Sequence, residues 1–382
     1  MKKLTIVQLF LSLQSTFVFA QGVAVGQRFD LTSELQLNQN TTGQFAQIFI
    51  PNHFKVSDDG KFTLVFHLHS ASWAAEDEVY KSQANAILFN IHLGALSSPY
   101  QSYFQDSEKF KIILQKVIMV LQNNNIIANP QIETLIVTSF SAGYAGVREI
   151  FATPAYYDQI SALALADGLH CNYDPISKEQ QLQDFLRYAR DAGDRKKIML
   201  LTHSEIPTTG YESTTQTANY LINGIDAQRI AVNAVDEIGI QKSACDTGYF
   251  HLKGYAGDTA NDHLKHLYAM NLMLEKIIQI LSQITVGLND KIFRPEQPFL
   301  IYTYPNPFNA VTNIVYQLPR TTAVSLKMYD SLGRLVQGIF EEIQSMGSHI
   351  LTWDGSKYSS GLYFCQLNWD GNVQSGRCLL VK

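Results

Sequence analysis

Residues 135–146 read Leu-Ile-Val-Thr-Ser-Phe-Ser-Ala-Gly-Tyr-Ala-Gly, and this stretch decides the fold. An apolar strand runs directly into a turn built from small residues, and a helical segment follows. This order is typical of the nucleophile elbow, in which a sharp strand-to-helix turn lifts a serine hydroxyl above the sheet. We therefore predict Ser141 as a nucleophile, with the backbone N–H of Ala142 as an oxyanion donor.

The stretch departs from the Gly-x-Ser-x-Gly pattern of such elbows at its first position. Ser139 stands there, and serine is small enough for the close crossing of strand and helix backbones. The buried strand before the turn and the helix after it strengthen a pattern that would be weak alone. The alternative is a serine-rich connection that has no catalytic role.

The rest of residues 21–285 alternates short apolar runs with helical segments. This alternation is typical of an α/β domain with a doubly wound, mostly parallel sheet, whose buried strands appear as continuous apolar runs. The predicted strands are 44–50, 62–68, 86–92, 134–138, 160–166, 197–202 and 249–254. The predicted helices are 108–123, 142–151, 179–192, 213–224 and 262–282.

A serine nucleophile needs a base, and the base is oriented by an acid. We predict His263 as the base, because it follows the last strand at the start of the last helix; its alternative role is to cap that helix. Two carboxylates are candidates for the acid, Asp167 after the strand 160–166 and Glu205 after the next strand. Asp167 is preferred, because it emerges from a buried strand at the carboxyl edge of the sheet, where a buried carboxylate needs a partner.

Further candidates follow other predicted strands. The turn after strand 62–68 offers the backbone N–H of Ser70 as a second oxyanion donor, although glycine is common at that place. The candidates for substrate binding are Trp73, His69, His170 and His203. Trp73 has an alternative role as a lid contact. Histidines at one sheet edge also suit zinc, but no H-E-x-x-H or similar spacing appears, so no metal or organic cofactor is predicted.

The elbow, the late histidine and the early histidine turn make residues 21–285 resemble an α/β-hydrolase of the serine esterase kind. The resemblance implies hydrolysis of a carboxylic ester through an acyl-enzyme, with a small-molecule or acylated carbohydrate ester as substrate. Residues 71–85 and 207–215 are expected to be loops that shape the pocket. Two alternatives stay open: a surface-displayed binding protein on an inactive hydrolase scaffold, and a metal-dependent hydrolase with histidine ligands.

The pattern changes after residue 285. Residues 286–300 contain Pro295 and Pro298 among polar residues and are predicted to be a linker. Beyond them, short alternating strands and turn signals predict an all-β sandwich of immunoglobulin type. Its distinctive pieces are Tyr-Pro-Asn-Pro-Phe-Asn at 304–309, Tyr-Asp at 329–330, Trp-Asp-Gly at 353–355, Ser-Gly-Leu-Tyr-Phe at 360–364 and a lysine at 382.

These pieces, in this order, make residues 301–382 resemble the type A C-terminal sorting domain of the type IX secretion system. The resemblance implies recognition by the type IX secretion machinery, passage across the outer membrane, and release or attachment to the cell surface. The other end agrees, because Lys2 and Lys3 precede an apolar run that closes at Ala20, and residues 1–20 are predicted to be a signal peptide. The alternative for this run is a membrane anchor; no later stretch is long and apolar enough to span a bilayer.

Charge and cysteine content add two expectations. The net charge of -5 argues against a nucleic-acid partner, because phosphate binding needs a basic surface. Export permits disulfides, and Cys365 and Cys378 flank a turn-rich segment across which they can face each other. Cys171 and Cys245 would then form the remaining pair, and the alternative is four free thiols.

Overall fold

The structure is a computed structural model of the 382-residue chain. It describes residues 23–38, 43–286, 301–304, 306–318, 322–344, 347–369 and 372–382. The predicted signal peptide lies outside these residues, and so does the predicted linker apart from residue 286. The chain divides into two compact units: the described residues up to 286 form the first, except for Asn129–Gln131, which group with the second.

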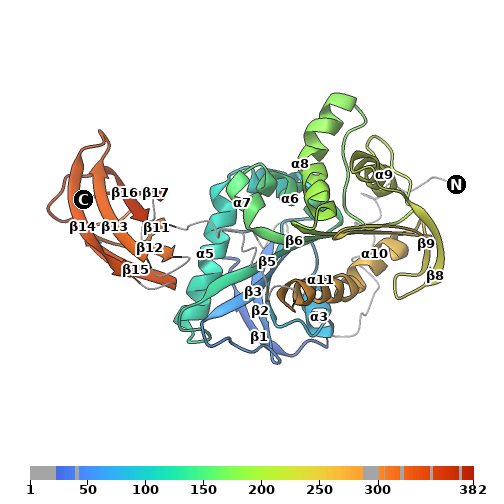
Figure 1. Cartoon of the computed structure of the whole chain (residues 1–382), viewed down its shortest axis with the longest axis horizontal. Helices are drawn as coiled ribbons and strands as arrows, with labels where there is room; N and C mark the ends of the chain where they lie inside the picture. The colour runs from blue at the N-terminus through green and yellow to red at the C-terminus, as the bar shows by residue number, and fades with distance from the viewer. Residues whose placement is uncertain are drawn as a thin grey trace. The chain divides into compact units, whose positions relative to one another are not determined.

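A ten-stranded mixed sheet forms the centre of the first unit (Figure 1). Its strand order is β1-β2-β4-β3-β5-β6-β7-β10-β9-β8. Strand β3 is parallel to β4, and the neighbours β5, β6, β7 and β10 are also parallel, whereas β1, β2, β8 and β9 pair antiparallel toward the two edges. The strands are β1 (Gly26–Asp30), β2 (Phe45–Pro51), β3 (Lys61–Leu68), β4 (Ala86–His92), β5 (Gln131–Phe140), β6 (Ile160–Ala166), β7 (Ile198–His203), β8 (Ile230–Val235), β9 (Ile240–Thr247) and β10 (Phe250–Tyr255).

Helices cover both faces of this sheet, because its buried strands are apolar on both sides (Figure 1). In β6, Leu163 and Leu165 belong to one buried cluster, while Ala162 and Ala164 belong to the cluster on the opposite face. The first cluster contains side chains of α4 (Ser97–Phe104), α5 (Glu108–Asn123), α6 (Tyr144–Phe151), α7 (Pro154–Gln159), α8 (Pro175–Gly193) and α9 (Thr214–Gly224). The second contains side chains of α3 (Ser72–Lys81), α10 (Ala260–Tyr268) and α11 (Met270–Val286).

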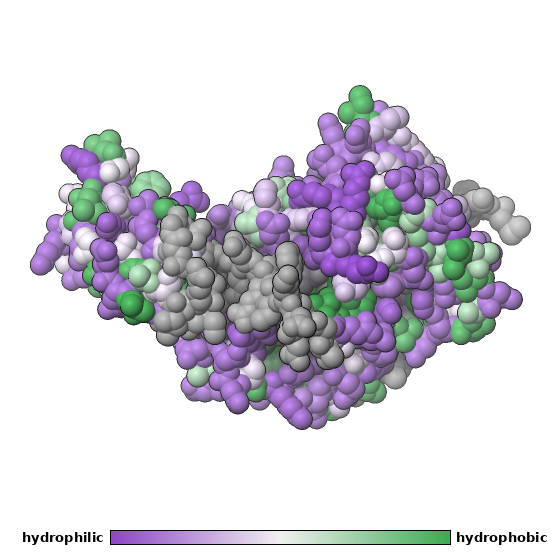
Figure 2. All heavy atoms as spheres, in the orientation of Figure 1, coloured by the Kyte–Doolittle hydropathy of each residue, from purple (hydrophilic) through white to green (hydrophobic). Residues whose placement is uncertain are grey.

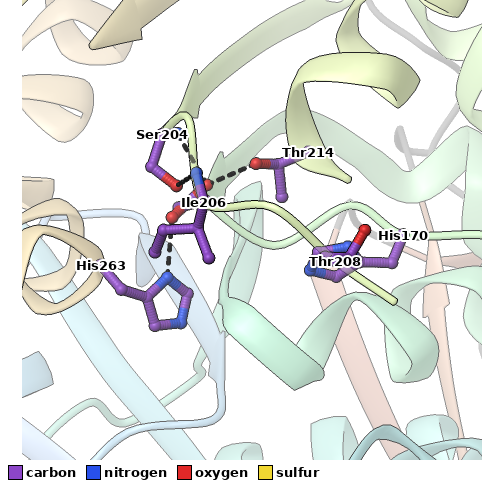
Figure 3. Close-up of a pocket in the computed structure, with 7 residues that line it drawn as sticks. His170, Ser204, Ile206, Thr208, Thr214 and His263 are labelled. Atoms are coloured by element: carbon purple, nitrogen blue, oxygen red, sulfur yellow. Dashed lines mark hydrogen bonds and ion pairs between the residues drawn. The ribbon is translucent and has the colours of Figure 1, made fainter. Parts of the chain in front are cut away.

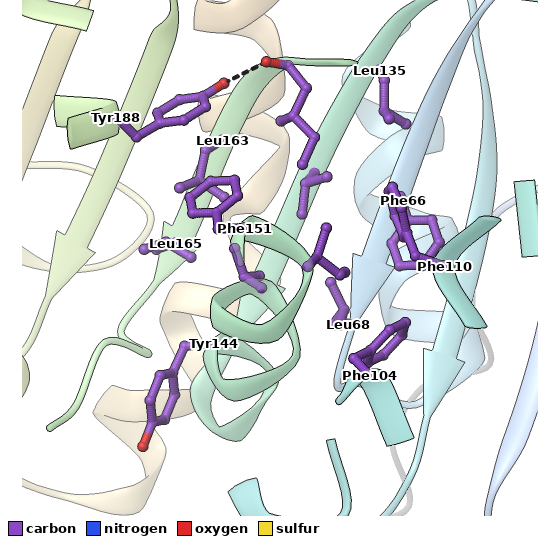
Figure 4. Close-up of a cluster of buried hydrophobic side chains, with 14 of the residues drawn as sticks. Phe66, Leu68, Phe104, Phe110, Leu135, Tyr144, Phe151, Leu163, Leu165 and Tyr188 are labelled. Carbon is purple, nitrogen blue, oxygen red and sulfur yellow. Dashed lines mark hydrogen bonds between the residues drawn. The ribbon is translucent and has the colours of Figure 1, made fainter. Parts of the chain in front are cut away.

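Aromatic packing anchors the helix that follows the predicted elbow (Figure 4). Phe151 ends α6 and stacks on Tyr188 of α8 with ring centroids 5.1 Å apart. The Tyr188 hydroxyl donates to the Ile160 carbonyl at 3.0 Å, so the buried phenol is satisfied. Burial of such rings contributes on the order of 2 kcal/mol each. The helix is therefore held rigidly against the strands that carry the candidate site.

Several sequence predictions are confirmed at the residue level, and others are wrong. The elements at 86–92, 160–166 and 108–123 have the predicted bounds. Residues 71–85, however, are not a loop, because Ser72–Lys81 forms helix α3. Three consecutive acidic residues, Glu76, Asp77 and Glu78, are buried on this helix. Carboxylates on the buried side destroyed the apolar period by which a helix is recognised.

The helix predicted at 262–282 is also wrong in one respect, because it divides in two. Helix α10 ends at Tyr268, and α11 begins at Met270. The Glu78 carboxylate accepts the backbone N–H of Asn271 at 3.0 Å and so satisfies a donor in the first turn of α11. A contact with the distant helix α3 therefore helps to hold the start of α11.

The outer hairpin of the sheet was not predicted either. Strands β8 and β9 pair antiparallel at the edge beyond β10. Ile230, Val235 and Ile240 are exposed there, and Figure 2 shows hydrophobic atoms gathered over this hairpin. An exposed strand lacks the apolar alternation that indicates a half-buried one.

The second unit contains two antiparallel sheets, as the all-β prediction required. One has the order β11-β12-β15 and the other β14-β13-β16-β17. Trp353 and Phe308 pack together in the buried cluster of this unit, with ring centroids 5.6 Å apart. The strands are β11 (Ile301–Tyr304), β12 (Val311–Leu318), β13 (Thr322–Asp330), β14 (Leu335–Gln344), β15 (Gly347–Asp354), β16 (Gly361–Trp369) and β17 (Asn372–Leu380).

Of the two alternatives for the cysteines, the structure shows the second, in which all four are thiols. All four cysteines are buried, and no disulfide joins any two of these described residues. In the β16–β17 hairpin, Cys365 lies opposite Gly376 and Cys378 lies opposite Tyr363, so the two cysteines are not paired across the strands. Burial raises the pKa of Cys378 to about 12, which keeps it a neutral thiol.

Candidate active site

Ser141 lies at the turn between β5 and α6, in the short 3-10 helix Ser141–Gly143. Its φ of +47° is in the left-handed region, which residues other than glycine rarely adopt. Such backbone strain persists only where the surroundings hold it, and it is concentrated at functional sites. The residue is buried, with 7% of its surface exposed. The turn has the sharpness that an elbow requires.

Two glycines allow this turn to be tight. A Cβ on Gly143 would lie 2.5 Å from the Leu68 carbonyl oxygen, and a Cβ on Gly168 would lie 2.5 Å from the backbone N and O of Ser141. Neither contact is tolerable, so both positions need glycine. Leu68 ends β3, and Gly168 lies just beyond β6. The ends of β3, β5 and β6 therefore meet around Ser141.

Asp167 follows β6 directly, and its φ of +42° is again left-handed. Its Oδ1 accepts from the backbone N–H of Ser204 at 2.9 Å and from the Thr214 hydroxyl at 2.6 Å, and its Oδ2 accepts from His263 Nδ1 at 2.7 Å (Figure 3). Burial alone would raise the pKa of Asp167, but the neighbouring imidazoles of His266 and His263 outweigh burial and hold it well below its usual value. Asp167 is therefore an ionised carboxylate with three donors.

His263 lies in the first turn of α10. A capping box fixes that turn, since the Thr259 hydroxyl accepts from the Asp262 N–H and the Asp262 carboxylate accepts from the Thr259 N–H. The helix cap is thus Thr259, and His263 is left for another role. Because a carboxylate only accepts, the contact with Asp167 puts an imidazole proton on Nδ1 and leaves Nε2 as the acceptor of the neutral ring. The ring centroid lies 4.5 Å from that of Phe140, the last residue before the elbow.

The alternative acid lies elsewhere. The Glu205 carboxylate pairs with Lys242 Nζ at 3.0 Å, and its side chain is 47% exposed. His266, one turn after His263, is buried against the Thr202 hydroxyl at 2.9 Å. Burial lowers the pKa of His266 to about 4, so its ring is neutral. The structure therefore brings Asp167, and not Glu205, to His263.

The two predicted oxyanion donors lie on neighbouring turns. Ala142 is inside the 3-10 turn, and Ser70 follows His69, whose φ of +77° bends the chain sharply after β3. The close approach of Gly143 to the end of β3 brings these two turns together. The Ser70 hydroxyl accepts from the Asn90 side-chain amide at 3.3 Å, which steadies its turn.

A small pocket lies beside the Asp167–His263 pair (Figure 3). Ser141 is not among the residues that line it. Two of its lining residues, Ile206 and Thr208, belong to the segment between β7 and α9, close to the predicted loop at 207–215. The lining residues are Asp167, His170, Ser204, Ile206, Thr208, Thr214 and His263.

Of the four predicted substrate-binding residues, only His170 lines this pocket. His69 is buried with its Nδ1 2.9 Å from the Tyr100 hydroxyl. His203 contacts Arg229 at 2.8 Å. Trp73 lies on α3 and stacks on Tyr268 of α10, with ring centroids 5.7 Å apart. Each of these three side chains therefore contacts another side chain and does not line the pocket.

Two of the histidines at the sheet edge lie together, because the rings of His69 and His92 stack with centroids 5.3 Å apart. His67 instead contacts the Thr138 hydroxyl at 2.8 Å. Among the residues that the structure describes, no group of three His, Cys, Asp or Glu side chains is arranged to hold a metal ion.

Sequence reasoning missed the two residues that hold Asp167. Thr214 begins α9, and Ser204 follows β7, so both lie at element ends where polar residues are ordinary. Ser204 acts through its backbone N–H, which every residue but proline has. Only Thr214 could have been noticed in the sequence, because its hydroxyl lies at a predicted helix start. A threonine at that place is, however, also what a helix cap requires.

Comparisons with known proteins place the C-terminal unit. Residues 302–382 match the family model described as a secretion system C-terminal sorting domain. No curated protein matches the chain. Two solved structures from Porphyromonas gingivalis resemble about a fifth of it: PorZ, a surface component of the type-IX secretion system (19% identity, 22% of this chain and 11% of that one, TM-score 0.17), and dimeric latent PorU (20%, 21% and 9%, TM-score 0.18).

A third solved structure resembles a larger part. The enterobactin esterase FES from Shigella flexneri is 12% identical over 69% of this chain and 61% of that one, with a TM-score of 0.40. The chain thus spans less than two thirds of the length of each of these three proteins.

The sorting domain fixes the destination of the protein. A chain that carries it is exported across the outer membrane, to the cell surface or into the surroundings. Within the described ranges, none of the helices is both long and apolar enough to cross a membrane.

Proposed function

We propose that residues 21–285 form a serine hydrolase domain of the α/β-hydrolase kind that cleaves carboxylic esters. The observation that carries the proposal is the buried hydrogen bond from His263 to Asp167, with the His263 ring packed on Phe140, the residue before the strained turn at Ser141. Strain at the serine, a carboxylate with three donors and an imidazole with a fixed proton support a role in nucleophilic catalysis.

In the proposed reaction, His263 Nε2 accepts the proton of Ser141 as the serine Oγ attacks the ester carbonyl. The backbone N–H groups of Ala142 and Ser70 donate to the oxyanion that forms. His263 then gives the proton to the leaving alcohol, and an acyl-enzyme remains. Water, deprotonated by His263, releases the acid and restores Ser141.

Asp167 has two roles in this scheme. Its Oδ2 keeps the proton of His263 on Nδ1, so that Nε2 faces the nucleophile as an acceptor. Its negative charge stabilises the imidazolium that forms when Ser141 gives up its proton. The donors from Ser204 and Thr214 hold the carboxylate in the required orientation.

The other parts of the chain are assigned to delivery. Residues 1–20 would act as a signal peptide, 286–300 as a linker, and 301–382 as the sorting domain that the type IX secretion machinery recognises. The proposed substrates are small-molecule or acylated carbohydrate esters, because the pocket is small and all but one of its lining residues are polar.

The test is active-site labelling with a fluorophosphonate, together with hydrolysis of short-chain p-nitrophenyl esters. The purified protein should be labelled at one serine and should turn over the esters, and Ser141→Ala should abolish both. Ser139→Ala, two residues away, is the matched control and should still be labelled. Equal labelling of Ser141→Ala and the wild type would sink the proposal, and no labelling at all would favour the binding-protein alternative.

A further inference from the structure

We infer that the pocket beside the Asp167–His263 pair selects esters with a hydroxyl group close to the scissile bond, and that His170 accepts the hydrogen bond of this hydroxyl. The inference rests on the proposed function, because it names the substrate class of the same site. It starts from the one predicted substrate residue that lines the pocket.

The backbone carbonyl of Glu212 determines which nitrogen of the His170 ring carries the proton. Its Nδ1 lies 2.9 Å from the Glu212 carbonyl oxygen. A carbonyl only accepts, so Nδ1 must carry the proton, and Nε2 of the neutral ring is then an acceptor. Burial lowers the pKa of His170, which keeps the ring neutral near pH 7. No residue that the structure describes donates to this Nε2.

The ring is also held in place before any ligand arrives. Tyr144 and Tyr211 meet it edge to face, with ring centroids 5.6 and 5.1 Å away. His170 and Thr208 both line the pocket (Figure 3). An acceptor that is already oriented loses little entropy on binding, so its hydrogen bond is expressed as selectivity.

Two of the three hydroxyl groups that line the pocket are committed as donors. Thr208 donates to the Tyr211 carbonyl at 2.6 Å, and Thr214 donates to Asp167 at 2.6 Å. Together with His170, these side chains present lone pairs to the pocket. The ligand group that meets them must supply the hydrogen.

A hydroxyl group fits better than an ammonium group. The carboxylate of Asp167 already receives three hydrogen bonds, and Glu212 pairs with Lys178 Nζ at 2.9 Å. A cation would therefore lose its hydration without gaining an unpaired counter-charge, which is costly. A neutral donor bears no such penalty.

The test compares two pairs of esters that differ in a hydroxyl group. Methyl 3-hydroxybutanoate against methyl butanoate probes the acyl side, and glycerol monoacetate against propyl acetate probes the alcohol side; rates are measured by pH-stat titration. The wild type should show a higher kcat/KM for the hydroxylated ester in at least one pair. His170→Phe should lower that ratio about five- to tenfold, the usual effect of one hydrogen bond.

His53→Phe is the matched control, because His53 is also half-buried, bonds one carbonyl (Ala84, 3.2 Å) and packs on a tyrosine, but lies outside the pocket. It should leave the ratio unchanged. Fluorophosphonate labelling shows that each variant is folded, and His170→Gln, which keeps an acceptor, should recover part of the ratio. A wild-type ratio near one in both pairs, or a ratio that His170→Phe and His170→Gln leave intact, overturns the inference alone. Failure of the wild type to be labelled overturns the proposed function, and the inference with it.

Discussion

Replacing Asp167 by asparagine tests the proposed mechanism most directly. The substitution keeps the shape of the side chain but replaces Oδ2, which accepts the hydrogen bond from His263, by an NH2 group that donates one. Ser204 and Thr214 both donate to Oδ1, so the amide oxygen should occupy that position. Turning the amide around would set its NH2 against two donors, at a cost of about 1–3 kcal/mol. The NH2 group therefore faces His263.

The consequence falls on the tautomer of the base. An amide NH2 needs an acceptor, so His263 must place its lone pair on Nδ1 and its proton on Nε2. That nitrogen can no longer accept the proton of Ser141. In serine hydrolysis by a triad, such a wrong tautomer lowers kcat about 10⁴-fold. We expect a fall of about 10³–10⁴-fold in kcat for Asp167→Asn, with KM changed less than about threefold, since Asp167 is not proposed to touch the substrate.

The assay is the initial rate with p-nitrophenyl butanoate, together with the rate of fluorophosphonate labelling and a urea unfolding curve. Glu205→Gln is the control, and because that carboxylate is exposed and paired with Lys242, its rate should stay within about twofold of wild type. If Asp167→Asn is folded and keeps more than a tenth of the wild-type kcat, the reasoning from the tautomer is refuted. If Glu205→Gln loses the activity instead, the acid is Glu205.

Three further predictions follow from separate features of the chain. Gly168→Ala should destabilise the protein by more than about 2 kcal/mol in urea unfolding and slow labelling at Ser141, because its Cβ would lie 2.5 Å from the backbone of that serine; unchanged labelling would contradict the proposed close packing. Burial raises the pKa of Glu78 to about 7, so the stability that its protonated form contributes is full below pH 4.5 and is lost as the pH rises through 7. Glu78→Gln should therefore make the free energy of unfolding depend less on pH between 4.5 and 7. An equal pH dependence in both proteins would refute the assignment. Deletion of residues 301–382 should leave labelling of the remaining chain intact and stop its export, measured by fractionating cells, and export of the shortened chain would show a second signal.

The parts of the fold that sequence predicted share one physical property. Strands buried on both faces, such as 86–92 and 160–166, appear as unbroken apolar runs, and the amphipathic helix 108–123 has an apolar stripe. In each, local composition and tertiary environment require the same residues. Helix α3 lacks this agreement, because each of its buried carboxylates has a partner far away in sequence: the Arg28 side chain, the Ala24 N–H or the Asn271 N–H. Glu78 also has a local partner, Lys81. Burial of charge is decided by such partners, and a local pattern does not contain them.

The choice between Asp167 and Glu205 depends on the same kind of information. Both carboxylates follow a buried parallel strand at the same edge of the sheet, so the strand pattern alone favours neither strongly. The distinction comes from donors supplied by other segments: Ser204 after the next strand, Thr214 at a helix start and His263 far along the chain all converge on Asp167, whereas Glu205 meets one exposed lysine. A carboxylate that is desolvated and receives three donors is held in one orientation, and an exposed one paired with a flexible lysine is not. A carboxylate can orient an imidazole only if it is itself held in one orientation. The donors around Asp167, more than its place after a strand, therefore identify it as the acid that can orient His263.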